Sequence, residues 1–322
     1  MQSQSKENMT TNKKQIKQIN GIKINNRIKA YDRTYKRVEL SDDMLRTLQL
    51  NLLEMLIEID RICKKYDIKY SIDGGTLLGA VRHSGFIPWD DDIDVIMRRE
   101  EYQKFYKACR KELDKKRFFL QEYRTDPHYR FGYEKMRRLD TEFVRLGQEH
   151  VKSRGGIFVD IFVVDNVPDG FIMRRLHLFA CYVIRKLLYA QLGMKNADSL
   201  FFRKWYGLLY RVVPRDAVFR LRNRIAYRCS RKRTELVRHM TYPYVRSRYG
   251  MPGDCFDEMM DMQFEGYTFR AFCKYDKYLS ALYGDYMKLP PKEQQKAHLD
   301  VSRIRLLDLE QLYSKEELSR LL

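Results

Sequence analysis

The chain has 322 residues, of which 44% are hydrophobic and 33% charged, and its formal net charge is +19. This length supports a sizeable core in one large domain or two smaller ones, and the composition is that of a globular protein. The positive charge is concentrated, because residues 171–250 hold 19 lysines and arginines against 3 acids and residues 1–40 hold 10 against 3. We therefore expect a polyanionic partner for these parts: anionic lipid, a charged polymer or nucleic acid.

The cysteines and the apolar stretches exclude several classes of protein. The six cysteines lie far apart, without the close spacing of disulfide frameworks and zinc sites, so we expect reduced thiols in a cytoplasmic protein. The first residues lack the apolar run of a signal peptide. The most apolar stretch, 176–194, is interrupted by Arg185 and Lys186, which makes it unsuitable as a membrane span but suited to a membrane interface.

The first half of the chain alternates helices and strands. Residues 1–40 are polar and basic without a hydrophobic period, which predicts a flexible or loosely docked tail. Ser41 is a suitable helix cap, and apolar residues at steps of three and four then predict a helix up to Cys63. A short strand at 68–73 is broken by Gly74–Gly75, and a short helix follows at 76–83.

Further elements follow in the order of an α+β protein. We predict a strand at 92–97, a helix at 99–114, and strands at 118–123, 131–138, 142–146 and 157–164. Residues 171–240 change to long basic helices with apolar stripes, divided at Pro214, and helices are expected near 274–284 and 309–322. The pattern predicts a mixed sheet flanked by helices in residues 41–322, with a basic helical insertion at about 171–250.

Four aspartates lie within residues 90–94. In a strand, Asp92 and Asp94 project from the same face, because residues two apart share a side of the sheet. Two adjacent carboxylates suit Mg²⁺, which takes few protein ligands and completes its shell with water and substrate phosphates. Asp90 and Asp91 are interpreted either as groups behind the metal ligands or as solvated loop residues.

A third acid and a glycine turn complete the expected site. Asp160 lies within the apolar run 157–162, and a buried acid needs a partner, for which we favour the metal over a backbone hydrogen bond. Gly74 and Gly75 stand between a strand and a helix, where the backbone approaches a ligand closely and free N–H groups face phosphate, unless they form an ordinary turn.

Several basic residues are candidates for binding phosphate. Lys135 and Arg137 share one strand face, where they either stabilise a leaving nucleotide or are simply exposed cations. His298 is expected to reach the site from the C-terminal part of the chain, although a lone histidine is a weak signal. Arg82 is either a donor contact or a packing residue.

The stretch DGGTLLGAVRHSGFIPWDDDIDV, residues 73–95, closely resembles the LicD family, and the likeness continues through 133–141, 158–165 and 283–298. This family has a nucleotidyltransferase-type fold and includes bacterial phosphocholine transferases and fukutin-related sugar-phosphate transferases. The resemblance implies that Asp92, Asp94 and Asp160 hold Mg²⁺ or Mn²⁺, and that the glycine turn with Thr76 contacts the donor. It implies transfer of phosphocholine or a similar group from a CDP-activated donor to a hydroxyl of a lipopolysaccharide, capsule or teichoic-acid glycan, with Asp160 as our choice of base.

Two alternatives remain open at this stage. The same fold in other nucleotidyltransferases adds a nucleotide to a small acceptor, which leaves the nucleotide on the product instead of releasing it. The second alternative is that the chain is not an enzyme but a basic adaptor, with a degenerate site, that binds a membrane or a polyanion. The basic helices favour peripheral binding to the inner face of the membrane, whereas nucleic acid is an unlikely partner because no reading motif is present.

Overall fold

The computed structural model describes residues 36–309, except residue 231 and residues 245–248. These residues belong to one unit, Tyr31–Leu322, and the other unit of the chain, Met1–Ala30, lies outside the described residues. The tail predicted at 1–40 is therefore described only from residue 36, where Val38 donates a backbone hydrogen bond to Val301. The helix predicted near 309–322 falls almost entirely outside the described residues.

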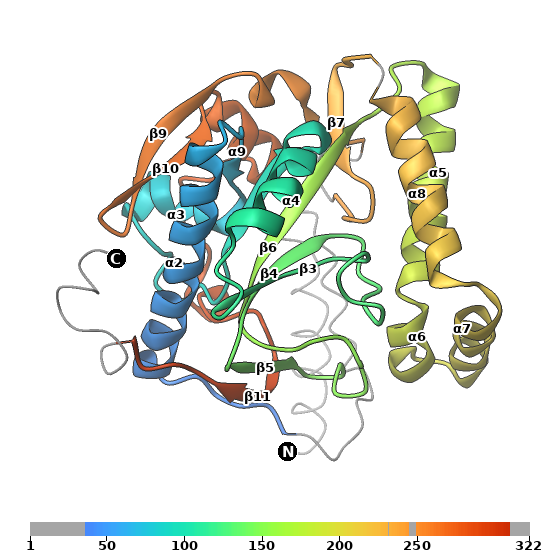
Figure 1. Cartoon of the computed structure of the whole chain (residues 1–322), viewed down its shortest axis with the longest axis horizontal. Coiled ribbons are helices and arrows are strands. Elements are labelled where there is room, and N and C mark those ends of the chain that lie inside the picture. The colour runs from blue at the N-terminus through green and yellow to red at the C-terminus, as the bar shows by residue number, and fades with distance from the viewer. Residues whose placement is uncertain (1–35, 231, 245–248, 310–322) are drawn as a thin grey trace, which may run out of the picture. The chain divides into compact units, whose positions relative to one another are not determined.

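A mixed sheet forms the centre of this unit, as predicted (Figure 1). Its strands lie in the order β1 (Ser71–Ile72), β2 (Asp94–Arg98), β6 (Phe158–Asn166), β4 (Glu134–Arg138) and β3 (Phe118–Gln121). Strands β2 and β6 are parallel, and the other neighbours in this order are antiparallel. At its far end β6 also pairs with β7 (Leu236–His239), which in turn pairs with β8 (Met251–Pro252).

The amphipathic helices α2 (Asp42–Lys65) and α4 (Arg99–Glu112) pack against the sheet, and the short helix α3 (Gly74–His83) follows β1. Helix α2 begins at Ser41, whose hydroxyl accepts a hydrogen bond from the backbone N–H of Met44 at 3.3 Å. It packs against β6, β4 and α4, and its apolar stripe is fully buried in the main core. Helix α3 begins directly after β1, so its N-terminus lies beside the start of β2. These elements confirm the helices predicted between residues 41 and 114.

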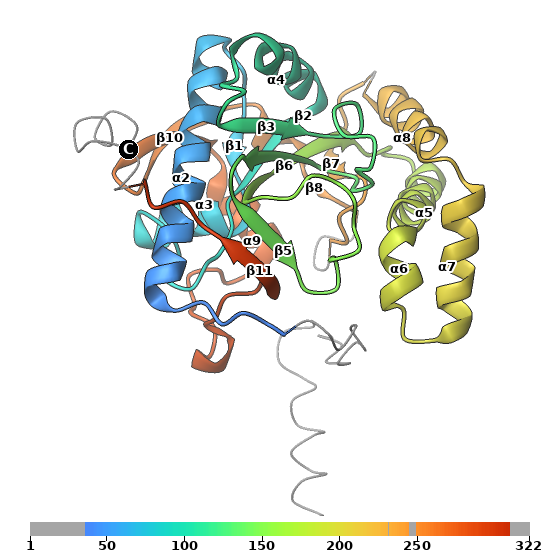
Figure 2. The ribbon, with the colours of Figure 1, turned by 60° about the horizontal axis from the view of Figure 1, so that its bottom comes forward.

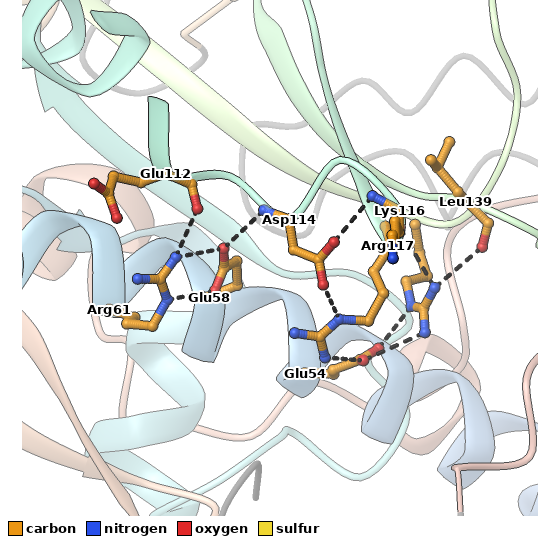
Figure 3. Close-up of polar contacts among 9 residues, drawn as sticks. Glu54, Glu58, Arg61, Glu112, Asp114, Lys116, Arg117 and Leu139 are labelled. Carbon is orange, nitrogen blue, oxygen red and sulfur yellow. Dashed lines mark hydrogen bonds and ion pairs between the residues drawn. The ribbon is translucent and has the colours of Figure 1, made fainter. Parts of the chain in front are cut away.

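Helix α2 is also attached by buried ion pairs (Figure 3). Glu54 of α2 accepts from Arg138 of β4 at 2.8 Å and from Arg117 at 3.2 Å. Arg117 also binds Asp114 at 2.8 Å, in the connection between α4 and β3. Because Glu54 is 3% exposed, removing either arginine would leave a buried carboxylate with less compensation, and the helix is therefore held in one position over the sheet.

The basic region forms four helices grouped at one side of the sheet (Figures 1 and 2). They are α5 (Phe171–Leu188), α6 (Ala190–Asn196), α7 (Leu200–Val212) and α8 (Arg215–Cys229), the last beginning directly after Pro214. Helix α8 is attached to the sheet through Arg222, which is 1% exposed and lies 3.3 Å from Glu134 of β4. The prediction of helix up to residue 240 is wrong, because 236–239 form β7, where Val237 is buried in the sheet core.

The C-terminal part contains strands that the sequence analysis missed. Strands β9 (Met259–Phe264) and β10 (Tyr267–Phe272) form a hairpin whose turn residues, Glu265 and Gly266, both have positive φ. Strand β11 (Val301–Arg305) pairs with β5 (Glu142–Arg145). Helix α9 (Tyr275–Tyr283) confirms the helix expected near 274–284, and short 3-10 turns lie at Gly253–Phe256 and Lys292–Gln294. In the described part of the chain, no helix is both long and apolar enough to span a bilayer.

Candidate active site

Three neighbouring strands bring two acids and a lysine into one row. Asp94 of β2 is the register partner of Asp160 of β6, and Asp160 is the register partner of Lys135 of β4. Register partners on adjacent strands lie about 5 Å apart at Cα and share one face of the sheet. The row therefore crosses the middle of the sheet, with Asp160 between a carboxylate and a cation.

Asp92 lies just before this row. Strand β2 begins at Asp94, so the prediction that Asp92 also belongs to the strand is wrong. Its charge nevertheless acts on Asp94, because burial and then the negative charges of Asp92 and Asp160 raise the pKa of Asp94 well above its ordinary value. Like charges this close call for a cation or a proton.

The nearest cation to Asp160 is Lys135, with which it forms a buried ion pair. Burial raises the pKa of Asp160, and the charge and hydrogen bond of Lys135 oppose that rise. Burial likewise lowers the pKa of Lys135 to about 7, against the opposing charge of Asp160. The partner that the sequence argument required is thus Lys135, and the role of Asp160 as a metal ligand stays a prediction.

The glycine pair makes room for carboxylates. Gly74 has a φ of +53°, and a Cβ added there would lie 3.2 Å from Oδ2 of Asp94. A Cβ added at Gly75 would lie 2.7 Å from Oδ2 of Asp90, which is closer than real Cβ atoms approach. Thr76 accepts a hydrogen bond from the backbone N–H of Asp94 at 3.0 Å, and so fixes the start of β2. Contact of these three residues with a donor stays a prediction.

His298 reaches the acids from the C-terminal part of the chain. Its Nδ1 lies 2.8 Å from Asp91 and its Nε2 lies 3.0 Å from Asp92. Burial opposes protonation, but the hydrogen bonds to these two acids outweigh it and raise the pKa of His298 to about 11. Asp91 also accepts from the backbone N–H of Leu299 at 2.9 Å and is 1% exposed, so its interpretation as a solvated loop residue is wrong.

Asp90 is buried as well, but its carboxylate accepts fewer hydrogen bonds than that of Asp91. Its Oδ2 has no hydrogen-bond partner in the described part of the chain, and burial followed by the charge of Asp92 raises the pKa of Asp90 to about 8. A buried carboxylate oxygen without a partner is costly, which is consistent with a cation bound nearby.

The three acids expected to hold a metal offer the kind of ligand atom that a hard divalent cation prefers. Asp92, Asp94 and Asp160 offer carboxylate oxygens, which Mg²⁺ and Mn²⁺ prefer, and their mutual repulsion would be relieved by such an ion. A second group, whose ligand atoms lie within 4.8 Å of one another, consists of Asp90, Asp91, Asp92 and His298. Of the three expected ligands only Asp92 belongs to that group, so the joint binding of a cation by Asp92, Asp94 and Asp160 stays a prediction.

A large basic cavity, about 580 Å³ in volume, opens on the Lys135 side of the row. Arg137 lies in its wall, held by hydrogen bonds to Gln121 at 2.7 Å and to the carbonyl of Gly156 at 2.6 Å. Other cations of its lining are Arg138, Arg145, Arg154, Arg303 and Arg305. The structure thus brings Lys135 and Arg137 together, and the cavity is large enough for a nucleotide.

Arg82 is separated from these groups. It lies in the last turn of α3, eight residues from Gly74 and hence about 12 Å along the helix axis. Its guanidinium donates to the carbonyl of Tyr286 at 3.1 Å, which is the contact of a packing residue. A direct contact of Arg82 with a donor stays a prediction without geometric support.

A small cavity of about 60 Å³ opens on the Asp94 side of the row. Asp73 lies in its wall and accepts a hydrogen bond from the hydroxyl of Tyr278 at 2.6 Å. Burial raises the pKa of Asp73 to about 6, although this hydrogen bond opposes the rise. Neither residue was predicted as part of the site, since Asp73 stands inside the glycine motif and Tyr278 has the pattern of an ordinary core residue.

This arrangement matches a known class of domain. The family described as LicD/FKTN/FKRP, nucleotidyltransferase domain, matches residues 67–179, which contain the glycine pair and the whole acidic row. Lipopolysaccharide cholinephosphotransferase LicD from Haemophilus influenzae is 32% identical over 268 residues, which cover 79% of this chain and 95% of that protein. The chain therefore belongs to the LicD family, and it is a phosphotransferase of that family, as the sequence predicts.

Two shorter matches are to uncharacterized proteins of Rickettsia. RP689 of Rickettsia prowazekii is 33% identical over 24% of this chain and 38% of its own length. RT0683 of Rickettsia typhi is 42% identical over 21% of this chain and 24% of its own length. These matches cover too little of either protein to bear on activity.

Proposed function

We propose that the chain transfers phosphocholine from CDP-choline to a hydroxyl group of a cell-surface glycan, with lipopolysaccharide as the first candidate acceptor. The observation that carries the proposal is the row of Asp94, Asp160 and Lys135 beside a basic cavity of nucleotide size. The Haemophilus relative, whose name specifies lipopolysaccharide and phosphocholine, supports the choice of donor and acceptor.

Asp92, Asp94 and Asp160 are the residues that would hold Mg²⁺ or Mn²⁺. Such an ion, when bound, neutralises charge on a pyrophosphate and orients it for in-line displacement. Lys135 and Arg137 face the same cavity and attract the phosphates of the departing nucleotide.

The reaction exchanges one phosphorus–oxygen bond for another. The acceptor hydroxyl oxygen forms a bond to the phosphorus that carries choline, and the bond from that phosphorus to the bridging oxygen breaks. CMP leaves with the electron pair of the broken bond. We assign the hydroxyl proton to Asp160, because its carboxylate lies in the middle of the row. Its ion-pair partner Lys135 remains beside it as a cation once Asp160 is protonated.

The test measures CMP release from CDP-choline with purified acceptor and with or without Mg²⁺. Wild-type protein should release CMP and label the acceptor with choline only when the divalent ion is present. The double variant Asp92→Asn, Asp94→Asn should lose activity at least about 100-fold while it remains folded. The matched control is Asp67→Asn, which changes an exposed aspartate in the turn after α2. An active double variant would contradict the proposal.

The two alternatives give different products. A nucleotidyltransferase would leave the CMP moiety on the acceptor, so cytidine label would be found there instead of choline label. A non-enzymatic adaptor would bind vesicles or a polyanion equally well with and without the acids of the row, and would release no CMP from any donor.

We also propose that α5 and α7 bind an anionic membrane surface on the cytoplasmic side, where a glycolipid acceptor would be reached. Helix α7 has no buried residue, and Phe201 (70% exposed), Trp205 (49%) and Val212 (66%) form one apolar stripe on it. Residues 171–212 contain eight lysines and arginines but only one acid, Asp198. Exposed aromatic and aliphatic side chains among cations are typical of a helix that lies in the membrane interface.

Co-sedimentation with phosphatidylglycerol and phosphatidylcholine vesicles tests this surface. Wild-type protein should bind the anionic vesicles, less strongly as salt is raised, and Phe201→Ser with Trp205→Ser should weaken binding by about tenfold or more. Tyr227→Ser on α8 is the control, since that tyrosine is also exposed but lies on another helix. Binding to nucleic acid without binding to vesicles would contradict this assignment.

A further inference from the structure

The small cavity beside Asp94 has an unusual lining of aromatic side chains. Phe162 of β6 contributes one ring, and its centroid lies 5.8 Å from that of Tyr242. The ring of Tyr244 follows at 5.1 Å from Tyr242, and the ring of His239 lies 5.4 Å from Phe162. The remaining lining residues are Asp73, Gly74, Asp94, Ile96, Tyr278, Leu282 and Tyr283.

Two carboxylates and a neutral imidazole make this cavity favourable for positive charge. Asp73 and Asp94 both lie in its wall. His239 is 1% exposed, its Nε2 donates to the carbonyl of Gly132 at 3.1 Å, and its Nδ1 has no hydrogen-bond partner among the residues that the structure describes. Burial lowers the pKa of His239 well below its ordinary value, which favours the neutral ring. The neutral ring brings no positive charge into the cavity wall, and its Nδ1 carries a lone pair.

The lining distinguishes one kind of cation from another. A quaternary ammonium has no N–H group, so it is recognised by aromatic faces and a nearby negative charge rather than by hydrogen bonds. A primary ammonium requires three acceptors, and in this cavity one acceptor, Oδ1 of Asp73, is already engaged by Tyr278. The ring of Phe162 supplies a face without any hydrogen-bonding group, and Tyr242 supplies a face with a single hydroxyl at its edge.

We infer that this aromatic cavity binds the trimethylammonium group of the donor and thereby selects choline over ethanolamine. The inference rests on the proposed transfer reaction and names the part of the site that recognises the transferred group. Asp94 belongs both to the wall of the aromatic cavity and to the acidic row. When the phosphate of the donor lies at the row, the choline attached to it therefore reaches into the aromatic cavity. The nucleoside then occupies the basic cavity on the other side of Asp160, which Lys135 lines.

The first experiment needs neither donor turnover nor metal. Binding of choline to the full-length chain is measured by ligand-observed NMR, beside 3,3-dimethylbutan-1-ol, the uncharged molecule of the same shape. Choline should bind and the alcohol should bind at least about tenfold more weakly, because only choline carries the charge that the rings attract. Equal binding of the two, or no binding of choline, would overturn the inference.

The second experiment uses matched substitutions in the cavity wall. Tyr242→Leu removes a ring from a side chain that is 44% exposed, whereas Tyr242→Phe keeps the ring and removes only the hydroxyl. The leucine variant should lower the ratio of kcat/KM for CDP-choline to that for CDP-ethanolamine by about tenfold, and the phenylalanine variant should restore most of it. Phe162→Leu is a second ring deletion on β6, and Tyr227→Leu on α8 is the control outside the cavity.

The outcomes separate this inference from the proposed function. If CDP-choline is turned over but the donor ratio is the same in wild type, Tyr242→Leu and Phe162→Leu, the cavity assignment is wrong and the transfer reaction stands. If no CDP-linked donor is turned over, the transfer reaction is wrong, and the choline-binding measurement still decides what the cavity recognises. Thermal unfolding of each variant shows that a lost preference is not a lost fold.

Discussion

Asp94 and Asp160 are register partners on the parallel strands β2 and β6, so two carboxylates lie side by side in the interior of the site. Burial and the charge of Asp160 are both among the causes that raise the pKa of Asp94. On its other side Asp160 forms an ion pair with Lys135, whereas no cation pairs directly with Asp94 among the described residues. The row is therefore short of positive charge, and this deficit is the physical reason to expect a divalent cation there.

Replacing Asp94 by asparagine should separate stability from function. Asparagine keeps the shape and removes the charge, so without divalent ions we expect the free energy of unfolding to rise by about 1 kcal/mol. The increase in Tm that Mg²⁺ gives the wild type should disappear, and CMP release should fall at least about 100-fold. Thermal unfolding with EDTA and with Mg²⁺ measures both effects. A variant that Mg²⁺ stabilises as much as the wild type would show that Asp94 is not a ligand.

Lys135 should be essential to the stability of the row. Lys135→Met leaves Asp160 buried without its ion-pair partner, which typically costs about 3–5 kcal/mol of unfolding free energy. Adding Asp160→Asn to Lys135→Met should recover much of that loss, because the uncompensated charge is then gone. Lys104→Met is the control, since the Lys104–Glu101 pair is exposed and should contribute less than about 1 kcal/mol. Urea unfolding of the wild type, Lys135→Met, Asp160→Asn and the double variant gives the cycle, and a double variant no more stable than Lys135→Met would argue against charge as the cause.

The local part of this site could be predicted from sequence, whereas its long-range part could not. The spacing of Asp92 and Asp94 among apolar residues indicates paired carboxylates, and the apolar run around Asp160 indicates a buried acid. The pairing of Asp160 with Lys135 depends on the strand order β2–β6–β4, which no local pattern encodes. The ion pair between Asp160 and Lys135 was therefore not predicted, and a metal at Asp160 stays a prediction.

The aromatic cavity and the acid–histidine contacts illustrate the same limit. His298 meets Asp91 and Asp92 across a sequence separation of about two hundred residues, and the sequence indicates only that a histidine is present. Phe162 and Tyr242 come from different elements, and each looks like an ordinary core or surface aromatic in its own segment. The strands β9 and β10 were missed because their alternation is weak, although the Glu265–Gly266 turn is a hairpin signal.

The buried His177 should make stability depend on pH. It lies between Cys181 and Cys229, and burial, followed by the charge of Arg238 and against that of Asp165, lowers the pKa of His177 from 6.5 to about 4. Above pH 6.5 the ring is neutral in both the folded and the unfolded chain, and its contribution is fully present. As the pH falls toward 4 only the unfolded chain takes up the proton, so the folded state loses up to roughly 3 kcal/mol.

The variant His177→Gln isolates this contribution from that of other groups. His239 has the same sign, and the raised pKa values of Asp73 and Asp90 have the opposite sign, so the comparison is between slopes and not between absolute stabilities. The free energy of unfolding should fall less steeply between pH 6.5 and 4 in the variant than in the wild type. Urea titrations at several pH values measure the slopes, and identical slopes would mean that His177 is protonated alike in both states.

Alanine substitutions at Gly74 and Gly75 should have different effects on stability and activity. Gly74→Ala places a side chain at a φ of +53°, which costs about 1–2 kcal/mol, and its Cβ meets Asp94 at 3.2 Å. Gly75→Ala has no such backbone cost, but its Cβ would lie 2.7 Å from Oδ2 of Asp90, a side-chain atom that accepts no hydrogen bond from the described residues and can shift without breaking one. We therefore expect Gly74→Ala to lower both the unfolding free energy and the stabilisation by Mg²⁺, and Gly75→Ala to lower CMP release with little change in stability.

Gly207→Ala in α7 is the matched control for this pair. No atom of the described residues lies within 4 Å of a Cβ at that position, so alanine should stabilise the helix by about 0.5–1 kcal/mol. Urea unfolding and CMP release are measured for all three alanine variants. If Gly74→Ala were as stable as Gly207→Ala and retained the full response to Mg²⁺, the turn would not be shaped by the carboxylate beside it, and the glycine pair would be an ordinary connection between β1 and α3.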